Sequence, residues 1–241
     1  MVEICFVQLF YHAHIEPTFL LDKDESRHLV RVLRKTVGDQ VVFTDGRGRF
    51  YTCEIVVASD KKASLKVVSQ QEQPARKSQL TVAIAPTKNM DRLEWFVEKA
   101  VEIGIERIVP ILCEHSERKV IKIDRLERIA ISGMKQSLKA RIPQVSELMP
   151  FNEFVANDAS THKVLCHLPQ NGESLDLRNL EVRGDVTVLI GPEGDFAPVE
   201  IRSALDAGFV NHTLGEQRLR TETAGLVAVS HLAYLIDKMN V

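Results

Sequence analysis

The segment DVTVLIGPEGDFAPVEIRSALDAG, residues 185–208, constrains the fold more than any other part of the chain. Its first six residues are mostly apolar, which is typical of a central strand buried in a parallel sheet. The residues GPEGDF follow at 191–196, here called the first loop, and a helix is predicted near 198–207. A strand, a glycine-containing loop and a helix in this order predict an α/β unit that binds a ligand at the carboxyl end of the strand.

A second loop has the same setting. FVNHTLG, residues 209–215, is predicted to be a strand, and LGEQRLRTETAG at 214–225 leads towards a helix predicted from Thr223 to Met239. Residues 214–220 are called the second loop. Because the carboxyl ends of parallel strands meet at one edge of a sheet, we predict a single site between the two loops. The alternative is that both are ordinary connections.

Motifs of other enzyme classes are absent from the sequence. It contains no phosphate-binding loop with its lysine, no dinucleotide fingerprint and no Gly-x-Ser-x-Gly elbow. The four cysteines are scattered and form no Cys-x-x-Cys pair, so neither a disulfide framework nor a metal site is expected. Free thiols fit a reducing cytoplasm. The sequence shows no secretion signal and no apolar run long enough to span a membrane.

Alternating strands and helices continue through the C-terminal two thirds of the chain. Predicted strands are LTVAIAP, IERIVPILC, PQVSEL and KVLCHL, and predicted helices span 90–104, 124–139 and about 151–157. This alternation predicts an α/β domain with a mostly parallel sheet.

The N-terminal part has a different pattern. Alternating apolar residues on both sides of Asp45–Gly48 predict a β-hairpin. Ser26 is expected to cap a short helix ending at Lys35, with Leu29, Val32 and Leu33 facing inward. The stretch SQQEQPARKS at 69–78 has no large apolar residue and is predicted to be a linker. We therefore expect a small, mostly β unit, a barrel, before the α/β domain.

Basic residues are clustered although the net charge is only −2. Arg27, Arg31 and Arg34 follow a helical spacing, next to Lys35. Residues 117–141 contain eight Lys and Arg against three acidic residues. Such clusters are either solvated helix faces or surfaces that neutralise RNA phosphates.

Several segments together resemble one family. GPEG at 191–194 and L-G-x-x-x-L-R-T-E-T-A at 214–224 look like the C-terminal signature of the RsmE family. These are SPOUT-class enzymes that methylate N3 of one uridine in 16S ribosomal RNA. The resemblance extends over nearly the whole chain, to EKAVEIGIERIVPILCEHSERK at 98–119, MKQSLKARIPQV at 134–145 and HLVRVLRKTVGDQVVFTDGRG at 28–48.

The resemblance implies a fold, a cofactor and partners. A PUA-like β-barrel that binds RNA is expected over residues 1–72, and a trefoil-knotted α/β SPOUT domain over 78–241. The cofactor would be S-adenosylmethionine, the partner ribosomal RNA or the small subunit, and the enzyme a cytoplasmic homodimer without metal. Cofactor-binding residues carried over are Leu168, Gly191, Pro192, Glu193, Gly194, Leu214, Gly215, Leu219, Arg220, Thr221 and Thr223. RNA-binding residues are Arg27, Arg31, Arg34, Lys35, Lys139 and Arg141.

Two positions depart from the family pattern. Asp195 stands where the family usually has a second glycine after GPEG, and Lys139 where it often has arginine. The first change adds a Cβ and a charge to the first loop. The second change would replace the planar guanidinium of arginine, which can donate two parallel hydrogen bonds to RNA, by the compact ammonium group of lysine.

The chemistry of uridine methylation suggests two catalytic candidates. The uracil N3 proton must leave before the nitrogen becomes a good nucleophile. Arg220 is expected to stabilise the uracil anion or a phosphate, and Glu222 is a candidate base. The alternative for Glu222 is to cap the amides that begin the last helix. Alternative functions are methylation of another RNA position, such as a ribose 2′-hydroxyl, or RNA binding without catalysis.

Overall fold

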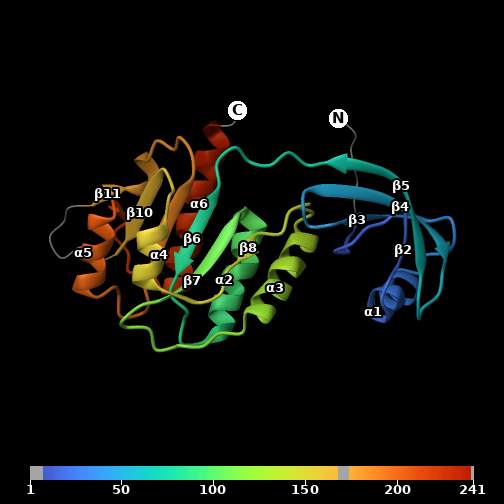
Figure 1. Cartoon of the computed structure of the whole chain (residues 1–241), viewed down its shortest axis with the longest axis horizontal. Coiled ribbons are helices and arrows are strands. Elements are labelled where there is room, and N and C mark those ends of the chain that lie inside the picture. The colour runs from blue at the N-terminus through green and yellow to red at the C-terminus, as the bar shows by residue number, and fades with distance from the viewer. Residues whose placement is uncertain (1–7, 168–173, 240–241) are drawn as a thin grey trace. The chain divides into compact units, whose positions relative to one another are not determined.

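A computed structural model describes residues 8–167 and 174–239 (Figure 1). The chain divides into two compact units. The first combines Met1–Ala75 with Met134–Ile142, and the second combines Arg76–Gly133 with Pro143–Val241. The first unit thus takes in a segment from the middle of the chain, which the domain limits predicted from the sequence did not include.

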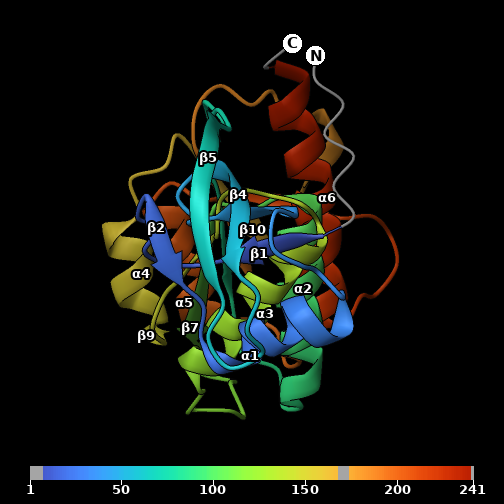
Figure 2. The same cartoon turned by 90° about the vertical axis from the view of Figure 1, so that its right-hand side faces the viewer.

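The first unit is built on a five-stranded sheet (Figure 2). Its strands are β1 (Leu9–Tyr11), β2 (Thr18–Leu20), β3 (Gln40–Thr44), β4 (Arg49–Val57) and β5 (Ser64–Glu72). They are ordered β1-β3-β4-β5-β2, with β1 and β3 parallel and the other neighbours antiparallel. The predicted hairpin is β3–β4, and Gly46 adopts φ +73° in its turn. Since β5 extends to Glu72, the predicted linker at 69–78 begins too early.

The predicted helix from Ser26 to Lys35 is only partly correct. Helix α1 (Lys23–Arg27) is capped by Asp22, whose carboxylate accepts from the Glu25 amide at 2.8 Å. Ser26 lies inside this helix, and its hydroxyl accepts from the Ala63 amide. A π-helical turn, η1 (His28–Val32), then changes the phase of the side chains. Val32 is consequently 64% exposed, although the α-helical period placed it inward.

The segment 134–142 is held in the first unit by hydrogen bonds to the β3–β4 hairpin. The Ala140 carbonyl accepts from the Gly48 amide at 2.8 Å and from the Thr44 hydroxyl at 3.0 Å. The Arg141 guanidinium donates to the carbonyls of Arg47 and Gln73 at 2.9 and 3.1 Å. These contacts make the segment an integral part of the unit.

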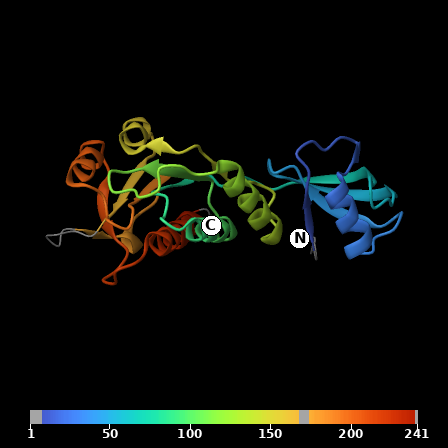
Figure 3. The ribbon, with the colours of Figure 1, turned by 90° about the horizontal axis from the view of Figure 1, so that it is seen from below.

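The second unit is an α/β structure with helices on both faces of a sheet (Figure 3). Its strands are β6 (Leu80–Ile84), β7 (Arg107–Leu112), β8 (Gln144–Val145), β9 (Met149–Pro150), β10 (His162–Cys166), β11 (Leu175–Asp176), β12 (Val186–Ile190) and β13 (Val210–Thr213). Its helices are α2 (Met90–Ile103), α3 (Ile123–Gln136, whose last three residues belong to the first unit), α4 (Phe151–Asn157), the 3-10 turn η2 (Leu177–Asn179), α5 (Pro198–Asp206) and α6 (Thr221–Met239).

Strand β12 occupies the centre of this parallel sheet. The order is β11-β13-β10-β12-β6-β7-β8, with β9 beside β7, and every observed pairing in the sheet is parallel. All five residues of β12 are buried, as its sequence predicted. Helices α2 and α6 pack on one face, and α4 and α5 lie on the other (Figure 3). Among the helices of the described ranges, none combines the length and apolar character needed to cross a membrane.

Candidate active site

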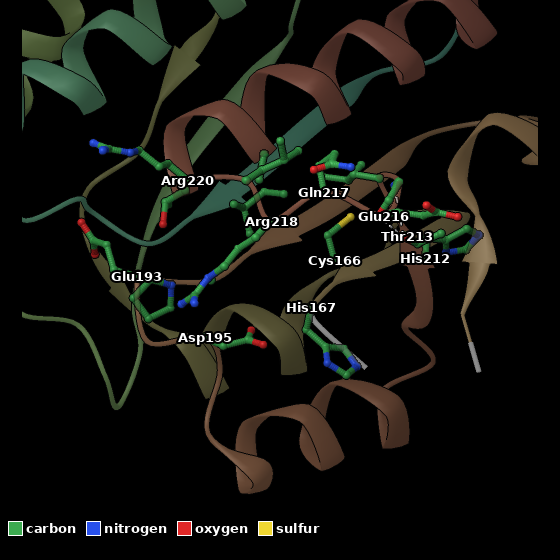
Figure 4. Close-up of a pocket in the computed structure, with 18 of the residues that line it drawn as sticks. Cys166, His167, Glu193, Asp195, His212, Thr213, Glu216, Gln217, Arg218 and Arg220 are labelled. Atoms are coloured by element: carbon green, nitrogen blue, oxygen red, sulfur yellow. Dashed lines mark hydrogen bonds between the residues drawn. The ribbon is translucent and has the colours of Figure 1, made fainter. Parts of the chain in front are cut away.

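The two predicted loops line one pocket at the carboxyl edge of the sheet (Figure 4). The first loop follows β12 and the second follows β13, with β10 between these strands. The cavity measures about 960 Å³, near the upper end of the range of about 300–1,000 Å³ typical of small-molecule sites. It is therefore large enough for a cofactor and a reacting group beside it.

The first loop is tied to the loops that follow the neighbouring strands. The Glu193 carboxylate accepts from the Lys88 amide, after β6, at 3.0 Å. The buried Glu200 carboxylate accepts from the Ala197 amide and from the Glu114 amide, which follows β7, each at 2.9 Å. Three connections at the same sheet edge are thus held together, so this wall of the pocket is preorganised.

Asp195 adopts a backbone conformation that favours glycine. Its φ is +62°, its amide donates to the Pro192 carbonyl at 3.0 Å, and its own carboxylate accepts from the Phe196 amide at 2.8 Å. Aspartate tolerates the left-handed region because its short side chain bonds locally to the backbone. The departure from the family glycine therefore keeps the turn that glycine would make.

The second loop presents two unpaired arginines. The Thr213 hydroxyl bonds to both the amide and the carbonyl of Gly215, the second residue of the loop, which adopts φ +122°. The guanidinium groups of Arg218 and Arg220 are exposed and have no ion-pair or hydrogen-bond partner among the described residues. In Figure 4 Arg218 extends towards the first loop, whereas Arg220 points away from the other labelled residues.

Helix α6 begins at Thr221, two residues earlier than predicted. Thr221 and Ala224, one helical turn apart, line the pocket. Glu222 is buried, does not line the pocket, and faces Arg92 of α2, with 3.8 Å between Arg92 Nε and Glu222 Oε1. The other carboxylate oxygen of Glu222 has no hydrogen-bond partner among the described residues.

The pocket also contains residues that the sequence analysis missed. At one end Arg178 pairs with Asp176, and this arginine lowers the pKa of Asp176 to about 2. Burial raises the pKa of the Cys166 thiol to about 12, so the thiol is protonated near neutral pH and is no nucleophile. These residues lie at or just after the ends of β10 and β11, and His212 is one residue before the end of β13. Ligands bind at the carboxyl ends of the strands in a parallel sheet. The same rule that predicted the two loops would therefore have predicted these pocket residues if the strand limits had been known.

Most of the predicted cofactor residues come together. Nine line the pocket, namely Gly191, Pro192, Glu193, Gly194, Leu214, Gly215, Leu219, Arg220 and Thr221. Thr223 does not line it, because it lies on another side of α6 from Thr221 and Ala224. Leu168 lies outside the described residues.

All six predicted RNA-binding residues belong to the first unit, including Lys139 and Arg141 from the later segment. Arg27, Arg31 and Arg34 are exposed, and Arg31 forms an ion pair with Asp60. Lys35 and Lys139 are half-buried. The first three arginines do not share a regular helical face, because they span the π-helical turn and Arg34 has φ +55°.

Comparison with known families gives two adjacent matches. Residues 74–233 match the family described as "RNA methyltransferase domain" and residues 21–68 match "RNA methyltransferase PUA domain". The protein named ribosomal RNA small subunit methyltransferase E from Bacillus subtilis is 27% identical over 235 residues, covering 90% of both chains. Its namesake from Mycobacterium tuberculosis is 29% identical and covers 91% of this chain and 87% of that protein.

Solved structures agree with these matches. A probable rRNA-methyltransferase from Porphyromonas gingivalis is 44% identical, with a TM-score of 0.91, covering 97% of this chain and 100% of that one. A ribosomal RNA small subunit methyltransferase E from Neisseria gonorrhoeae, bound to S-adenosyl methionine, is 26% identical with a TM-score of 0.82, covering 95% and 97%. The predicted architecture, an α/β RNA methyltransferase domain after a PUA-like N-terminal domain, is confirmed. The chain belongs to the family of PUA-containing RNA methyltransferases whose members include ribosomal RNA small subunit methyltransferase E.

Proposed function

We propose that the chain is an S-adenosylmethionine-dependent methyltransferase that modifies N3 of a uridine in 16S ribosomal RNA. The observation that carries the proposal is the pocket that the first and second loops line together, with two arginines, Arg218 and Arg220, that have no side-chain partner among the described residues. The names of the relatives and the cofactor bound in the Neisseria structure support the reaction class. Cytoplasmic location, a homodimer and a knotted second unit belong to the same proposal.

The residues of the pocket fit the cofactor. Pro192, Leu214 and Leu219 offer apolar surface to an adenine ring, and the surrounding loop backbone offers amides and carbonyls to its polar edge. Gly194 allows the first loop to pack closely on His115, where a Cβ would lie at 3.3 Å. When bound, S-adenosylmethionine supplies a methyl group that is already activated on a sulfonium, so the protein's task is to prepare the acceptor.

Arg220 is proposed to prepare that acceptor. A uracil that has lost its N3 proton carries negative charge, which a fixed guanidinium next to a helix N-terminus stabilises. Arg220 immediately precedes α6, and neither Glu193 nor Glu222 neutralises it. Its positive charge is therefore available to the RNA. Asp195 gives no support to a non-catalytic protein, because the first loop retains its turn.

Single-turnover methylation tests the proposal. Wild-type protein with 16S RNA or small subunits should yield N3-methyluridine, identified by mass spectrometry of the nucleosides. Arg220→Ala should lower the rate at saturating RNA by about 10²–10³-fold, with the cofactor still bound. Arg220→Lys should recover part of the rate, since lysine keeps the charge without the planar fork.

The outcomes separate the alternatives. A ribose-methylated product would replace the N3 assignment with the 2′-hydroxyl one, and binding of RNA and cofactor without any product would favour the non-catalytic reading. A wild-type rate in folded Arg220→Ala would remove the catalytic role of this residue. Melting temperatures measured beside the rates control for loss of fold.

A further inference from the structure

Arg92 and Glu222 join the first turns of the two helices that cover one face of the sheet. Arg92 lies near the start of α2 and Glu222 near the start of α6, and these helices pack together. The Arg92 side chain is 40% exposed and lines the pocket, whereas that of Glu222 is 10% exposed. The carboxylate thus lies behind the guanidinium, away from solvent.

The pairing is incomplete in a way that stability alone does not explain. Arg92 Nε and Glu222 Oε1 are 3.8 Å apart, which is an ion pair without a hydrogen bond. Within the part of the chain that the structure describes, Glu222 Oε2 has no hydrogen-bond partner. Burying a carboxylate with an unsatisfied oxygen is costly, and such groups in native proteins usually have a functional reason. Because the near atom of Arg92 is Nε, its two terminal nitrogens are not used by Glu222.

The position of Arg92 assigns it to the RNA side of the pocket. The loops proposed to hold the cofactor follow β12 and β13, whereas Arg92 follows β6, the neighbour of β12 on its other side. At the β11 end of the pocket, Arg178 is neutralised by Asp176. Glu222, the partner of Arg92, lies two residues after Arg220, and Arg218 and Arg220 lack partners among the described residues. The pocket arginines without a hydrogen bond to a carboxylate therefore come from the second loop and from α2, and not from the β11 end.

We propose that Arg92 binds a phosphate oxygen of the RNA backbone beside the target nucleotide, and that Glu222 is a positioning residue that orients Arg92. The inference rests on the proposed function, since it needs RNA in this pocket. A guanidinium that uses two terminal nitrogens can grip a phosphate with two parallel hydrogen bonds. Glu222 then holds the guanidinium in place and does not act as the general base.

The test compares steady-state methylation by wild type, Arg92→Ala, Arg92→Lys and Glu222→Gln. Arg92→Ala should raise KM for RNA roughly ten- to hundredfold, the usual effect of losing a charged hydrogen bond, and leave kcat nearly unchanged. The slope of log affinity for RNA against log salt concentration should become shallower by about one unit, which corresponds to the loss of one phosphate contact. Arg92→Lys should restore the salt slope and part of the affinity. Glu222→Gln should raise KM for RNA less than Arg92→Ala does. The double variant Arg92→Ala/Glu222→Gln should have the same KM as Arg92→Ala alone.

Two variants serve as matched controls. Lys99→Ala removes one positive charge from the same helix outside the pocket, and Glu94→Gln removes a carboxylate that pairs with Arg125 elsewhere. Both should keep the wild-type KM and salt slope. Calorimetry with S-adenosylmethionine should give the same affinity for wild type and Arg92→Ala.

Other results would overturn the inference. If cofactor affinity falls in Arg92→Ala while the RNA salt slope stays, the guanidinium binds the cofactor carboxylate. If Glu222→Gln abolishes kcat at saturating RNA and removes the acidic limb of its pH profile, Glu222 is the base. The inference is also refuted if Arg92→Ala and Arg92→Lys are both folded and both keep the wild-type KM for RNA. A wild-type protein that methylates no RNA would instead refute the proposed function.

Discussion

Replacement of Asp195 tests whether the first loop needs the left-handed conformation. The structure gives this residue φ +62° and a 2.8 Å hydrogen bond from the Phe196 amide to its own carboxylate. A left-handed conformation costs an L-residue about 1–2 kcal/mol, and a hydrogen bond contributes about 1 kcal/mol. In aspartate the two effects largely offset each other.

A series of four variants separates these effects. Asp195→Gly loses the hydrogen bond and also the steric cost, so its free energy of unfolding should stay within about 1 kcal/mol of wild type. Asp195→Asn keeps a side-chain oxygen and should be equally close. Asp195→Ala retains the cost without the bond and should lose about 1 kcal/mol, and the β-branched Asp195→Val should lose about 2 kcal/mol.

Thermal melting is the assay, with calorimetry of S-adenosylmethionine beside it. For a chain of this size, 1 kcal/mol corresponds to about 2–4 °C in Tm. The glycine variant should keep its cofactor affinity, because the bond from the residue 195 amide to the Pro192 carbonyl needs no side chain. A glycine variant as unstable as the valine variant would show that the backbone here is not left-handed, and the reasoning would fail.

Three further results are expected. Arg141→Ala should destabilise the protein by about 1–3 kcal/mol, because its guanidinium bonds to two backbone carbonyls; unchanged melting with weaker RNA binding would make it an RNA contact only. Burial raises the pKa of Cys53 and Cys166 to about 12, whereas unfolded cysteine ionises near about pH 8.5. Above that pH the folded state therefore holds more protons than the unfolded state. The free energy of unfolding should fall as pH rises from about 8.5 towards 11, and it should fall less steeply in Cys166→Ala. An equally steep fall in that variant would contradict the raised pKa of Cys166. Gly225→Ala should lower Tm, because a Cβ would lie 2.8 Å from the buried Phe96 ring and over-packing of about 1–3 kcal/mol exceeds the helix gain of about 1 kcal/mol; a higher Tm would mean that the ring moves aside.

The sequence predicted the elements whose periodicity is strong and local. Strand β12 and helix α2, with Gly104 directly after it, follow from apolar patterns that the structure keeps. The helix after Ser26 differs, because the π-helical turn at 28–32 depends on packing in the first unit and not on the local pattern. Long-range pairing is the common cause of the differences.

The candidate site was predictable to a similar extent. Both loops were predicted from glycines and charged residues that directly follow two apolar strands. This prediction needs only the position at which each strand ends. Arg92 and Cys166 were missed because each lies inside a predicted helix or strand, where its residue type carries no signal. Their role depends on which strands are neighbours in the sheet, and the local sequence does not determine the order of the strands.

The segment 134–142 has a consequence for how the protein is made. The hairpin at 44–48 and Gln73 bond to Ala140 and Arg141, so the first unit lacks partners for these groups until residue 142 has left the ribosome. Residue 142 is added 67 residues after the unit's N-terminal portion ends at Ala75. At synthesis rates of about 5–20 residues per second, this is a wait of about 3–13 s. The N-terminal portion of this unit is therefore made before its last segment, and the unit is completed only when Ile142 has been translated.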